Sequence, residues 1–255
     1  MAKIYAITNQ KGGVGKTTTS INLAASMVAM KRKVLLIDLD PQGNATMGSG
    51  VNKHDVELSV YDLLTSSVPL TDIICSSESG IDVIPANSDL TAAEVELLNL
   101  DNKEMILANK INEAKGKYDY VFIDCPPSLN MLTVNALCAS DGVIIPMQCE
   151  YFALEGVADL IQTVENISSV ANTKLEIEGV LRTMYDPRNS LTKDVSEQLT
   201  GFFGDKLYET VIPRNVRLAE APSYGMPIIQ YDKASKGAMA YLALAGEILR
   251  RHKTN

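Results

Sequence analysis

Short apolar runs alternate with longer segments of helical pattern along most of this sequence, and that alternation leaves few folds open. The expected strands are KIYAIT (3–8), KVLLIDLD (33–40), IDVIPA (81–86), YDYVFIDCP (118–126), DGVIIPM (141–147) and LEIEGVLRT (175–183). Helical patterns cover 17–30, 89–99, 103–115, 128–139, 153–171, 190–203 and 235–251. Because continuously apolar strands are buried on both faces, we predict an α/β fold with a doubly wound, mostly parallel sheet flanked by helices. Such sheets bind ligands at the carboxyl ends of their strands.

The size and composition of the chain are those of an ordinary globular protein. It has 255 residues, 46% of them hydrophobic, and no linker, repeat or low-complexity tract divides it. We therefore expect one domain over residues 1–255. No run of about 18 apolar residues and no signal-peptide pattern occurs. Cysteines without a C-x-x-C pair are typical of free thiols in a reducing cytoplasm, and this chain has Cys75, Cys125, Cys138 and Cys149.

Charge is distributed unevenly along the chain. The formal net charge of −8 argues at first sight against a nucleic-acid partner. Residues 1–173 contain 11 Lys and Arg against 21 Asp and Glu, whereas residues 174–255 contain 12 against 10. The excess of negative charge therefore lies in the first part of the chain, and a basic surface in the last third stays open.

The stretch TNQKGGVGKTTTS, from Thr8 to Ser20, has the pattern of a phosphate-binding loop between a strand and a helix. Three glycines let backbone N–H groups curl around an anion at the helix N-terminus. Lys16 would reach the β- and γ-phosphates, and the Thr17 hydroxyl would bind Mg²⁺. Two positions depart from G-x-x-x-x-G-K-[ST]: Gln10 replaces the first glycine, and Lys11 places a positive charge before the glycine pair.

Carboxylates at the ends of two later strands complete the predicted site. Asp124 closes YVFID and would hold Mg²⁺ directly or through water. Pro126-Pro127 end that strand, and Ser128 is expected to cap the next helix. Asp38 and Asp40 lie two apart at a strand tip, so their side chains point the same way, towards the loop. We assign one of them to metal-bound water and the other to the attacking water.

The nucleotide is expected to be ATP. The guanine-reading pattern N-K-x-D does occur, at residues 52–55. It lies before Asp124, in a polar segment rather than at the end of a late strand, so we interpret it as coincidental.

Together with IDLDPQGN (37–44), VFIDCPP (121–127) and PRNVRLAEAPSYGMPI (213–228), these motifs closely resemble the ParA/Soj family of DNA-partitioning ATPases. That family belongs to the deviant Walker A group of P-loop ATPases, with the MinD cell-division ATPases and the nitrogenase iron proteins. The resemblance runs nearly end to end. It implies a cytoplasmic, nucleoid-associated ATPase that uses ATP and Mg²⁺ and forms a homodimer with two nucleotides sandwiched at the interface.

The resemblance also implies roles for individual residues. The lysine matching Lys11 crosses to the phosphates of the partner's ATP, and the aspartate matching Asp40 positions the hydrolytic water; with Lys16 these are the expected catalytic residues. The residues expected near Mg²⁺ are Thr17, Asp38 and Asp124. The expected nucleotide contacts are Lys11, Gly12, Gly13, Val14, Gly15, Lys16, Thr17, Thr18, Pro213 and Arg214.

Partners follow from the same resemblance. Arg188 in YDPRNSL and Arg217 in NVRL match arginines with which chromosomal relatives hold DNA without sequence preference, and Lys233 and Lys236 would extend that patch. The alternative for each is a solvated loop charge. A ParB/Spo0J-type centromere-binding protein is the expected protein partner, and no membrane partner is expected. The N-terminal helix-turn-helix of larger plasmid relatives is not expected, and operator-specific repression is not expected either.

Three other functions fit the sequence less well. A MinD-like protein would end in a basic amphipathic membrane helix, and residues 238–252 are apolar enough to suggest one, but a terminal helix docked on the domain explains them more simply. A small-molecule ligase would need a substrate pocket beside the γ-phosphate, and no motif marks one. An iron–sulfur reductase would need two interfacial cysteines, and Cys125 follows Asp124 too closely for the second.

Overall fold

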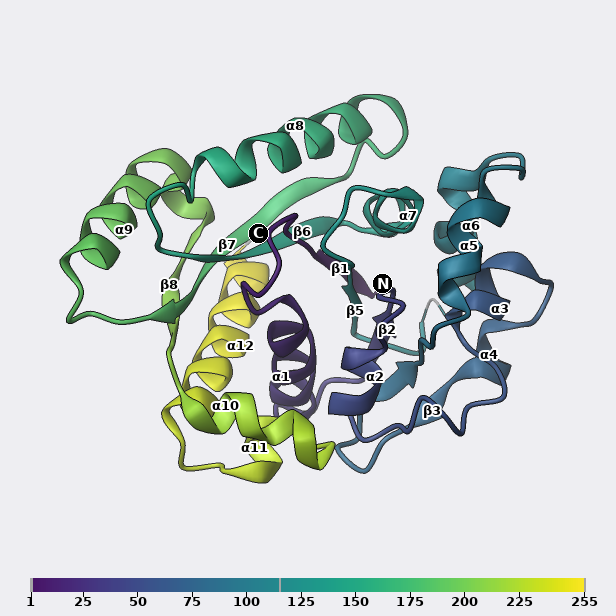
Figure 1. The fold of residues 1–255 in the computed structure, drawn as a ribbon, viewed down its shortest axis with the longest axis horizontal. Helices are drawn as coiled ribbons and strands as arrows, with labels where there is room; N and C mark the ends of the chain where they lie inside the picture. Colours follow the sequence, from purple (N-terminus) through teal and green to yellow (C-terminus); the bar gives the residue numbers. More distant parts are fainter. Residues whose placement is uncertain (1, 115, 255) are drawn as a thin grey trace.

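The computed structural model describes residues 2–114 and 116–254, and in them eight strands form one sheet in the order β3-β4-β2-β5-β1-β6-β7-β8. The strands are β1 (Lys3–Ile7), β2 (Val34–Asp38), β3 (Cys75–Ser76), β4 (Asp82–Ile84), β5 (Tyr120–Asp124), β6 (Gly142–Gln148), β7 (Glu176–Tyr185) and β8 (Leu207–Pro213). All neighbours pair in parallel except β3 and β4 at one edge. The predicted α/β fold with a mostly parallel sheet is confirmed (Figure 1).

Helices cover both faces of the sheet. They are α1 (Lys16–Ala29), α2 (Asn44–Gly48), α3 (Val60–Thr65), α4 (Leu70–Ile73), α5 (Leu90–Leu97), α6 (Ile106–Ile111), α7 (Met131–Ala139), α8 (Glu155–Val170), α9 (Ser190–Phe203), α10 (Val216–Glu220), α11 (Ile228–Tyr231) and α12 (Lys236–Thr254). Figure 1 shows α7, α8 and α9 on one side of the sheet and α1 with α12 on the other. Strand residues alternate accordingly: Val121 and Ile123 join one apolar core, and Tyr120 and Phe122 join the other.

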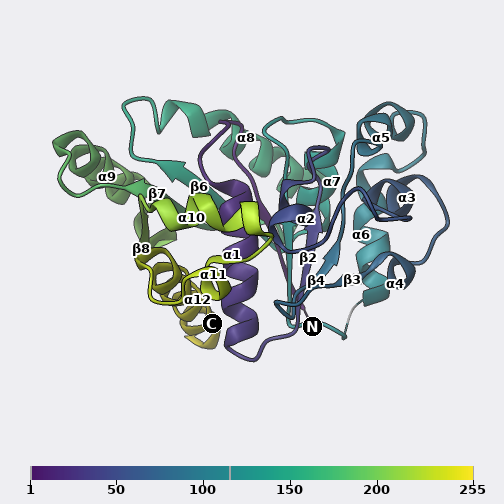
Figure 2. The ribbon, with the colours of Figure 1, turned by 60° about the horizontal axis from the view of Figure 1, so that its bottom comes forward.

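The order of the strands places the phosphate loop at the centre of the sheet. β1 lies between β5 and β6, so the loop that follows β1 is flanked by the carboxyl ends of both neighbours. β5 also pairs with β2, and Asp38 is opposite Asp124 in their register. Figure 2 shows α10 passing close to α1, and a cavity lined by residues of both helices confirms that they are neighbours. Every motif of the predicted site therefore reaches the same edge of the sheet.

Several elements differ from the sequence predictions. β8 was not predicted, because its mixture of buried, partly exposed and exposed residues differs from the continuously apolar pattern of the inner strands. The predicted helix 103–115 is instead a 3₁₀ turn (Lys103–Met105), α6 and a second 3₁₀ turn (Asn112–Ala114), with residue 115 outside the described residues. The predicted cap at Ser128 is wrong: α7 begins at Met131 and its cap is Asn130, whose side chain accepts from the Thr133 N–H at 3.1 Å.

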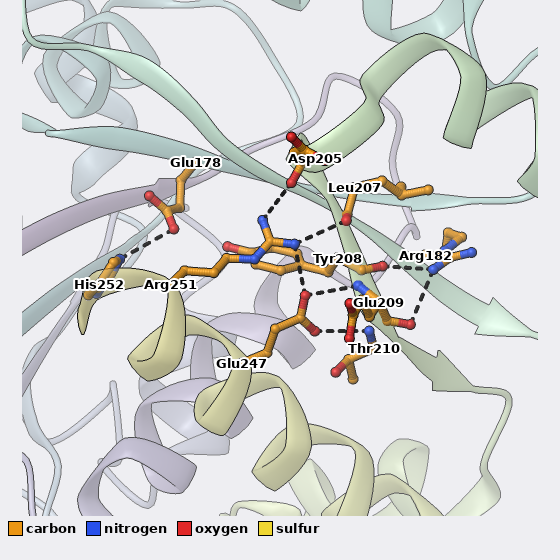
Figure 3. Close-up of polar contacts among 10 residues, drawn as sticks. All are labelled: Glu178, Arg182, Asp205, Leu207, Tyr208, Glu209, Thr210, Glu247, Arg251 and His252. Carbon is orange, nitrogen blue, oxygen red and sulfur yellow. Dashed lines mark hydrogen bonds and ion pairs between the residues drawn. The ribbon is translucent and has the colours of Figure 1, made fainter. Parts of the chain in front are cut away.

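A polar cluster fastens α12 to β8 (Figure 3). The buried carboxylate of Glu247 accepts the backbone N–H groups of Glu209 and Thr210, each at 2.9 Å. From the opposite side, the Arg182 guanidinium of β7 donates to the carbonyls of Tyr208 at 2.7 Å and Glu209 at 3.2 Å. The β7–β8 register is irregular at this point, so the two charged side chains satisfy backbone groups that the ladder leaves unpaired.

The predicted docking of the terminal helix on the domain is confirmed. Tyr241, Leu244, Ala245 and Ile248 of α12 are buried in the core that contains α1. None of the helices in the described residues is long and apolar enough to cross a membrane.

Candidate functional site

The loop between β1 and α1 presents free backbone donors. Gly13 and Gly15 have φ of +72° and +89°, a conformation that glycine adopts without steric cost. In the part of the chain that the structure describes, none of the N–H groups of residues 12–16 donates to another protein group. These donors lie at the positive end of the α1 dipole, which makes the loop a ready binding site for a phosphate group.

The first two residues of α1 face the carboxylates. Lys16 is 7% exposed, and its Nζ donates to the Lys11 carbonyl at 3.2 Å. Burial lowers the pKa of the Lys16 ammonium, while the charges of Asp124 and Asp40 act in the opposite direction. The Thr17 hydroxyl donates to Asp124 Oδ2 at 2.8 Å. Lys16, Thr17 and Asp124 are therefore brought together as the sequence predicted.

Asp38 and Asp124 are both fully buried. Asp124 accepts the Ser20 hydroxyl at 2.7 Å in addition to that of Thr17, whereas Asp38 accepts the N–H and the hydroxyl of Thr46, both at 2.8 Å. Burial raises the pKa of both carboxyls, and the charge of Asp38 raises that of Asp124 further. Two carboxylates buried side by side favour a bound cation, because without one their negative charges repel each other.

Asp40 is placed differently from Asp38. Its side chain is partly exposed and borders a cavity of about 300 Å³ that Lys16 and Thr17 also line. Asp38 lies beneath, with one oxygen accepting the Asp40 N–H at 3.1 Å and the other held by Thr46. The open carboxylate at the cavity is thus that of Asp40, and Asp38 supports it from below.

The protein side chains at this site can hold a hard cation such as Mg²⁺ only together with water and phosphate ligands. Among residues 2–114 and 116–254, no three His, Cys, Asp or Glu side chains gather as a metal site. A Mg²⁺ ion keeps several waters and takes oxygens from substrate phosphates, so the Thr17 hydroxyl and Asp124 next to a phosphate loop are sufficient protein ligands.

Lys11 does not point to its own phosphate loop. Its ammonium forms an ion pair with Glu150, just after β6, and the two side chains are 53% and 50% exposed. The Lys11 backbone is fixed by a hydrogen bond from its N–H to the Asn9 side chain at 3.0 Å. The second lysine of the loop is therefore held at the surface of the molecule.

A second cavity, of about 250 Å³, adjoins the loop. Gly15 and Thr18 line it from the phosphate side, Pro213 and Arg214 from the end of β8, and Tyr241 from α12. A mostly apolar cavity next to a phosphate loop suits a nucleotide base. The predicted nucleotide contacts at 213 and 214 thus lie beside those at the loop.

The four predicted DNA contacts come from three surface segments. Arg188 is exposed and makes two hydrogen bonds to Asp186, at 2.9 and 2.8 Å, which lower the pKa of Asp186 to about 2. Arg217 pairs with Glu220 at 2.8 Å and Asp232 at 3.6 Å. Lys233 and Lys236 are exposed beside Asp232 in sequence. Both arginines are therefore partly neutralised by carboxylates of their own chain.

Sequence reasoning missed the side chains that hold the predicted residues in place. Ser20 and Thr46 bind the two buried carboxylates, Glu150 binds Lys11, and Gln148 and Thr183 contact the phosphate loop. Gln148, Glu150 and Thr183 lie at or near the ends of strands, and Ser20 and Thr46 lie in the helices that follow β1 and β2; these positions do not specify a partner.

Known proteins resemble this chain over almost its whole length. The family described as an AAA domain matches residues 2–177. The sporulation initiation inhibitor protein Soj of Bacillus subtilis (strain 168) is 55% identical over 249 residues, which cover 97% of this chain and 98% of that protein. The chromosome partitioning protein ParA of Caulobacter vibrioides (strain NA1000 / CB15N) is 48% identical over 254 residues, covering 98% and 95%.

The fold also matches solved structures. A cobyrinic acid a,c-diamide synthase from Mycobacterium smegmatis with bound ADP and magnesium superposes with a TM-score of 0.88 and 35% identity. The match covers 99% of this chain and 96% of that one.

Proposed function

This chain belongs to the ParA/Soj family of chromosome-partitioning ATPases, and on that premise we propose that its ATP-bound homodimer holds DNA without sequence preference and releases it on hydrolysis. The chain is a ParA-like ATP hydrolase that uses ATP and Mg²⁺.

One observation carries the proposed dimer: Lys11 is fixed to the phosphate loop through its backbone, yet its ammonium lies at the surface on Glu150. Lys16 already supplies the buried positive charge beside the loop. A second, exposed lysine is suited to a phosphate group that belongs to another copy of the chain. Charge stabilisation of the leaving phosphate then depends on assembly, as with an arginine finger supplied in trans.

The residues of the site divide the work of hydrolysis. The loop N–H groups and Lys16 bind the phosphates, and Thr17 with Asp124 would hold Mg²⁺, which when bound neutralises phosphate charge. Asp40 faces the cavity beside them and orients the attacking water by accepting a hydrogen bond from it. Asp38 keeps the Asp40 backbone in position.

The proposed DNA surface combines Arg188 and Arg217 with Lys233 and Lys236. DNA phosphates would compete with Asp186, Glu220 and Asp232 for the two arginines. Binding through such contacts is independent of sequence and falls steeply with salt concentration. In the family a ParB-type protein stimulates hydrolysis, so we expect the ATP dimer to leave DNA faster when that partner is added.

Retention of DNA by the purified chain tests this proposal. Wild type should bind duplex DNA with ATP and Mg²⁺ but not with ADP, and Arg188→Glu should lower retention at least about tenfold while ATP-dependent dimerisation persists. Lys206→Glu, which changes a charge beside β8 and next to Glu176, is the matched control. Equal retention of DNA by Arg188→Glu and wild type would show that DNA binds to another surface of the molecule.

Two alternatives have their own outcomes in the same assay. Retention on anionic liposomes instead of DNA would favour a MinD-like function. Retention on neither surface would favour a small-molecule ligase, the class that the name of the Mycobacterium smegmatis structure suggests. Its identity of 35% is lower than the 55% and 48% of the partitioning proteins, and partitioning is therefore the better supported function.

A further inference from the structure

Two consecutive carbonyl groups of the phosphate loop are held by side chains from other strands. The Gly13 carbonyl accepts a hydrogen bond from Gln148 Nε2 at 3.0 Å, and the Val14 carbonyl accepts one from the Thr183 hydroxyl at 2.8 Å. Gln148 is the last residue of β6, and Thr183 lies in β7. Neither residue belongs to the loop or to α1.

The direction of a peptide N–H follows from that of its carbonyl. Carbonyl and N–H point to opposite sides of a planar trans peptide, and the described residues contain no cis peptide. Fixing the carbonyls of Gly13 and Val14 therefore fixes the N–H groups of Val14 and Gly15. Those N–H groups have no protein acceptor in the described chain, so they stay available to an anion.

The loop needs such external support. Gly13 and Gly15 have positive φ, and glycine has more backbone freedom to lose than any other residue. When the N–H donors are already oriented before the ligand binds, no binding free energy is used to order them, and the affinity is higher.

Thr183 is itself rigidly placed. It is 3% exposed, and its Cγ2 lies 3.8 Å from the point where a Cβ on Gly15 would stand. Its neighbour Arg182 anchors β7 through hydrogen bonds to Ser196 Oγ at 2.8 Å and to the Tyr208 carbonyl at 2.7 Å (Figure 3 shows the Tyr208 contact). Gln148 is also restrained, because Nε2 contacts Met184 Sδ at 2.8 Å.

We propose that Thr183 and Gln148 are positioning residues that aim the N–H groups of Val14 and Gly15 at the nucleotide phosphates. This proposal rests on the proposed ATPase function and adds two residues to its nucleotide-binding site. β6 and β7 thereby act as a fixed outer wall of the phosphate loop. Neither side chain is expected to contact the reacting atoms. Their effect is on nucleotide affinity, and the chemical step is left unchanged.

The decisive variants are Thr183→Val, which keeps the shape and removes the donor, and Thr183→Ser, which keeps the donor. Thr183→Val should weaken binding of Mg²⁺-ADP to the full-length chain about tenfold, the loss expected for one hydrogen bond to a loop that must then be ordered on binding. Thr183→Ser should stay within about twofold of wild type, because its hydroxyl still reaches the Val14 carbonyl.

Steady-state kinetics separate positioning from a general loss of structure. The loop N–H groups bind substrate and transition state alike, so Thr183→Val should raise KM with kcat unchanged. Gln148→Met should behave in the same way, and Gln162→Met, an exposed change in α8, should have no effect. Thermal unfolding of each variant without nucleotide checks that it is folded.

Three results would overturn the proposal. They are wild-type ADP affinity in Thr183→Val, equal weakening in Thr183→Ser and Thr183→Val, and a fall in kcat with KM unchanged. Each of these leaves the ATPase function standing. Failure of the wild-type chain to bind Mg²⁺-ADP would instead contradict the proposed function itself, so the two failures are distinguishable.

Discussion

At the scale of single residues, the aspartates at the end of β2 show how position divides roles between identical side chains. Asp38 is fully buried and saturated by Thr46 and the Asp40 N–H. Asp40 is partly exposed at the phosphate cavity and accepts the Gln42 N–H at 2.9 Å. Of the two aspartates, Asp40 is the one that lines the cavity, so the catalytic role that we propose belongs to Asp40 and the supporting role to Asp38.

Asp40→Ala should abolish hydrolysis without preventing ATP binding. Loss of a group that orients the nucleophile lowers the rate by a factor of about 10²–10⁴, and the ATP form should therefore accumulate on DNA. Phosphate release with DNA and a stimulating partner present measures this. Asp72→Ala, an exposed change in the first turn of α4, is the control. Near wild-type turnover by Asp40→Ala would remove Asp40 from the catalytic residues.

At the scale of secondary-structure elements, charged side chains complete the sheet where its ladder is irregular. Glu247 of α12 and Arg182 of β7 bind backbone groups of β8 from two directions. Burial alone would raise the pKa of Glu247, but the N–H groups of Thr210 and Glu209 and the charge of Arg251 lower it overall. The ionised carboxylate is therefore the form that holds α12 on β8.

Glu247→Gln should lower the free energy of unfolding by about 1–3 kcal/mol at pH 7, because two buried N–H groups lose a charged acceptor. The lowered pKa means that this stability is fully present above the pKa of the unfolded side chain, about 4.3, and is lost as pH falls through the lower folded value. Urea unfolding at pH 7 and at pH 3 measures both effects. Glu209→Gln, an exposed change in β8, is the control. If wild type and Glu247→Gln differed in free energy of unfolding by the same amount at pH 7 and pH 3, the ionised Glu247 carboxylate would not be the group that stabilises α12 on β8.

At the scale of the whole molecule, we propose that the ion pair between Lys11 and Glu150 opposes formation of the proposed dimer. The ammonium that we expect to reach a partner's nucleotide is held by a carboxylate of its own chain. Tyr151 and Phe152, directly after Glu150, are 76% and 67% exposed and pack edge to face. An apolar pair of this kind beside the lysine suits a surface that a second copy covers.

Glu150→Gln should therefore shift the monomer–dimer equilibrium with ATP about two- to fivefold towards the dimer, as expected for release of an exposed ion pair. Lys11→Ala should stay monomeric under conditions in which wild type dimerises. Light scattering at several protein concentrations measures both variants. Glu155→Gln, exposed at the start of α8, is the charge-matched control. Weaker dimerisation of Glu150→Gln would show that Glu150 contributes to the dimer and does not restrain it.

Local patterns were sufficient for the six inner strands of the sheet and for the residue types of the proposed phosphate site, but not for the edge strands β3 and β8. Strands such as 118–126 and 33–40 were predicted because full burial leaves continuous apolar runs, and the glycines, Lys16 and Thr17 because phosphate binding restricts residue types at fixed spacing. β8 escaped prediction because part of it faces solvent, and the short helices between β2 and β4 because each has too few residues to show a period.

The sequence by itself determined the six inner strands and the residue types of the proposed phosphate site, since both depend on residues close together in the chain. Only the tertiary structure decided that Asp38 is sealed by Thr46, that Lys11 lies on Glu150, and that Thr183 and Gln148 hold the loop. Those contacts join residues up to 169 positions apart. Side-chain hydrogen bonds over such separations depend on strand order and register, which no local pattern specifies.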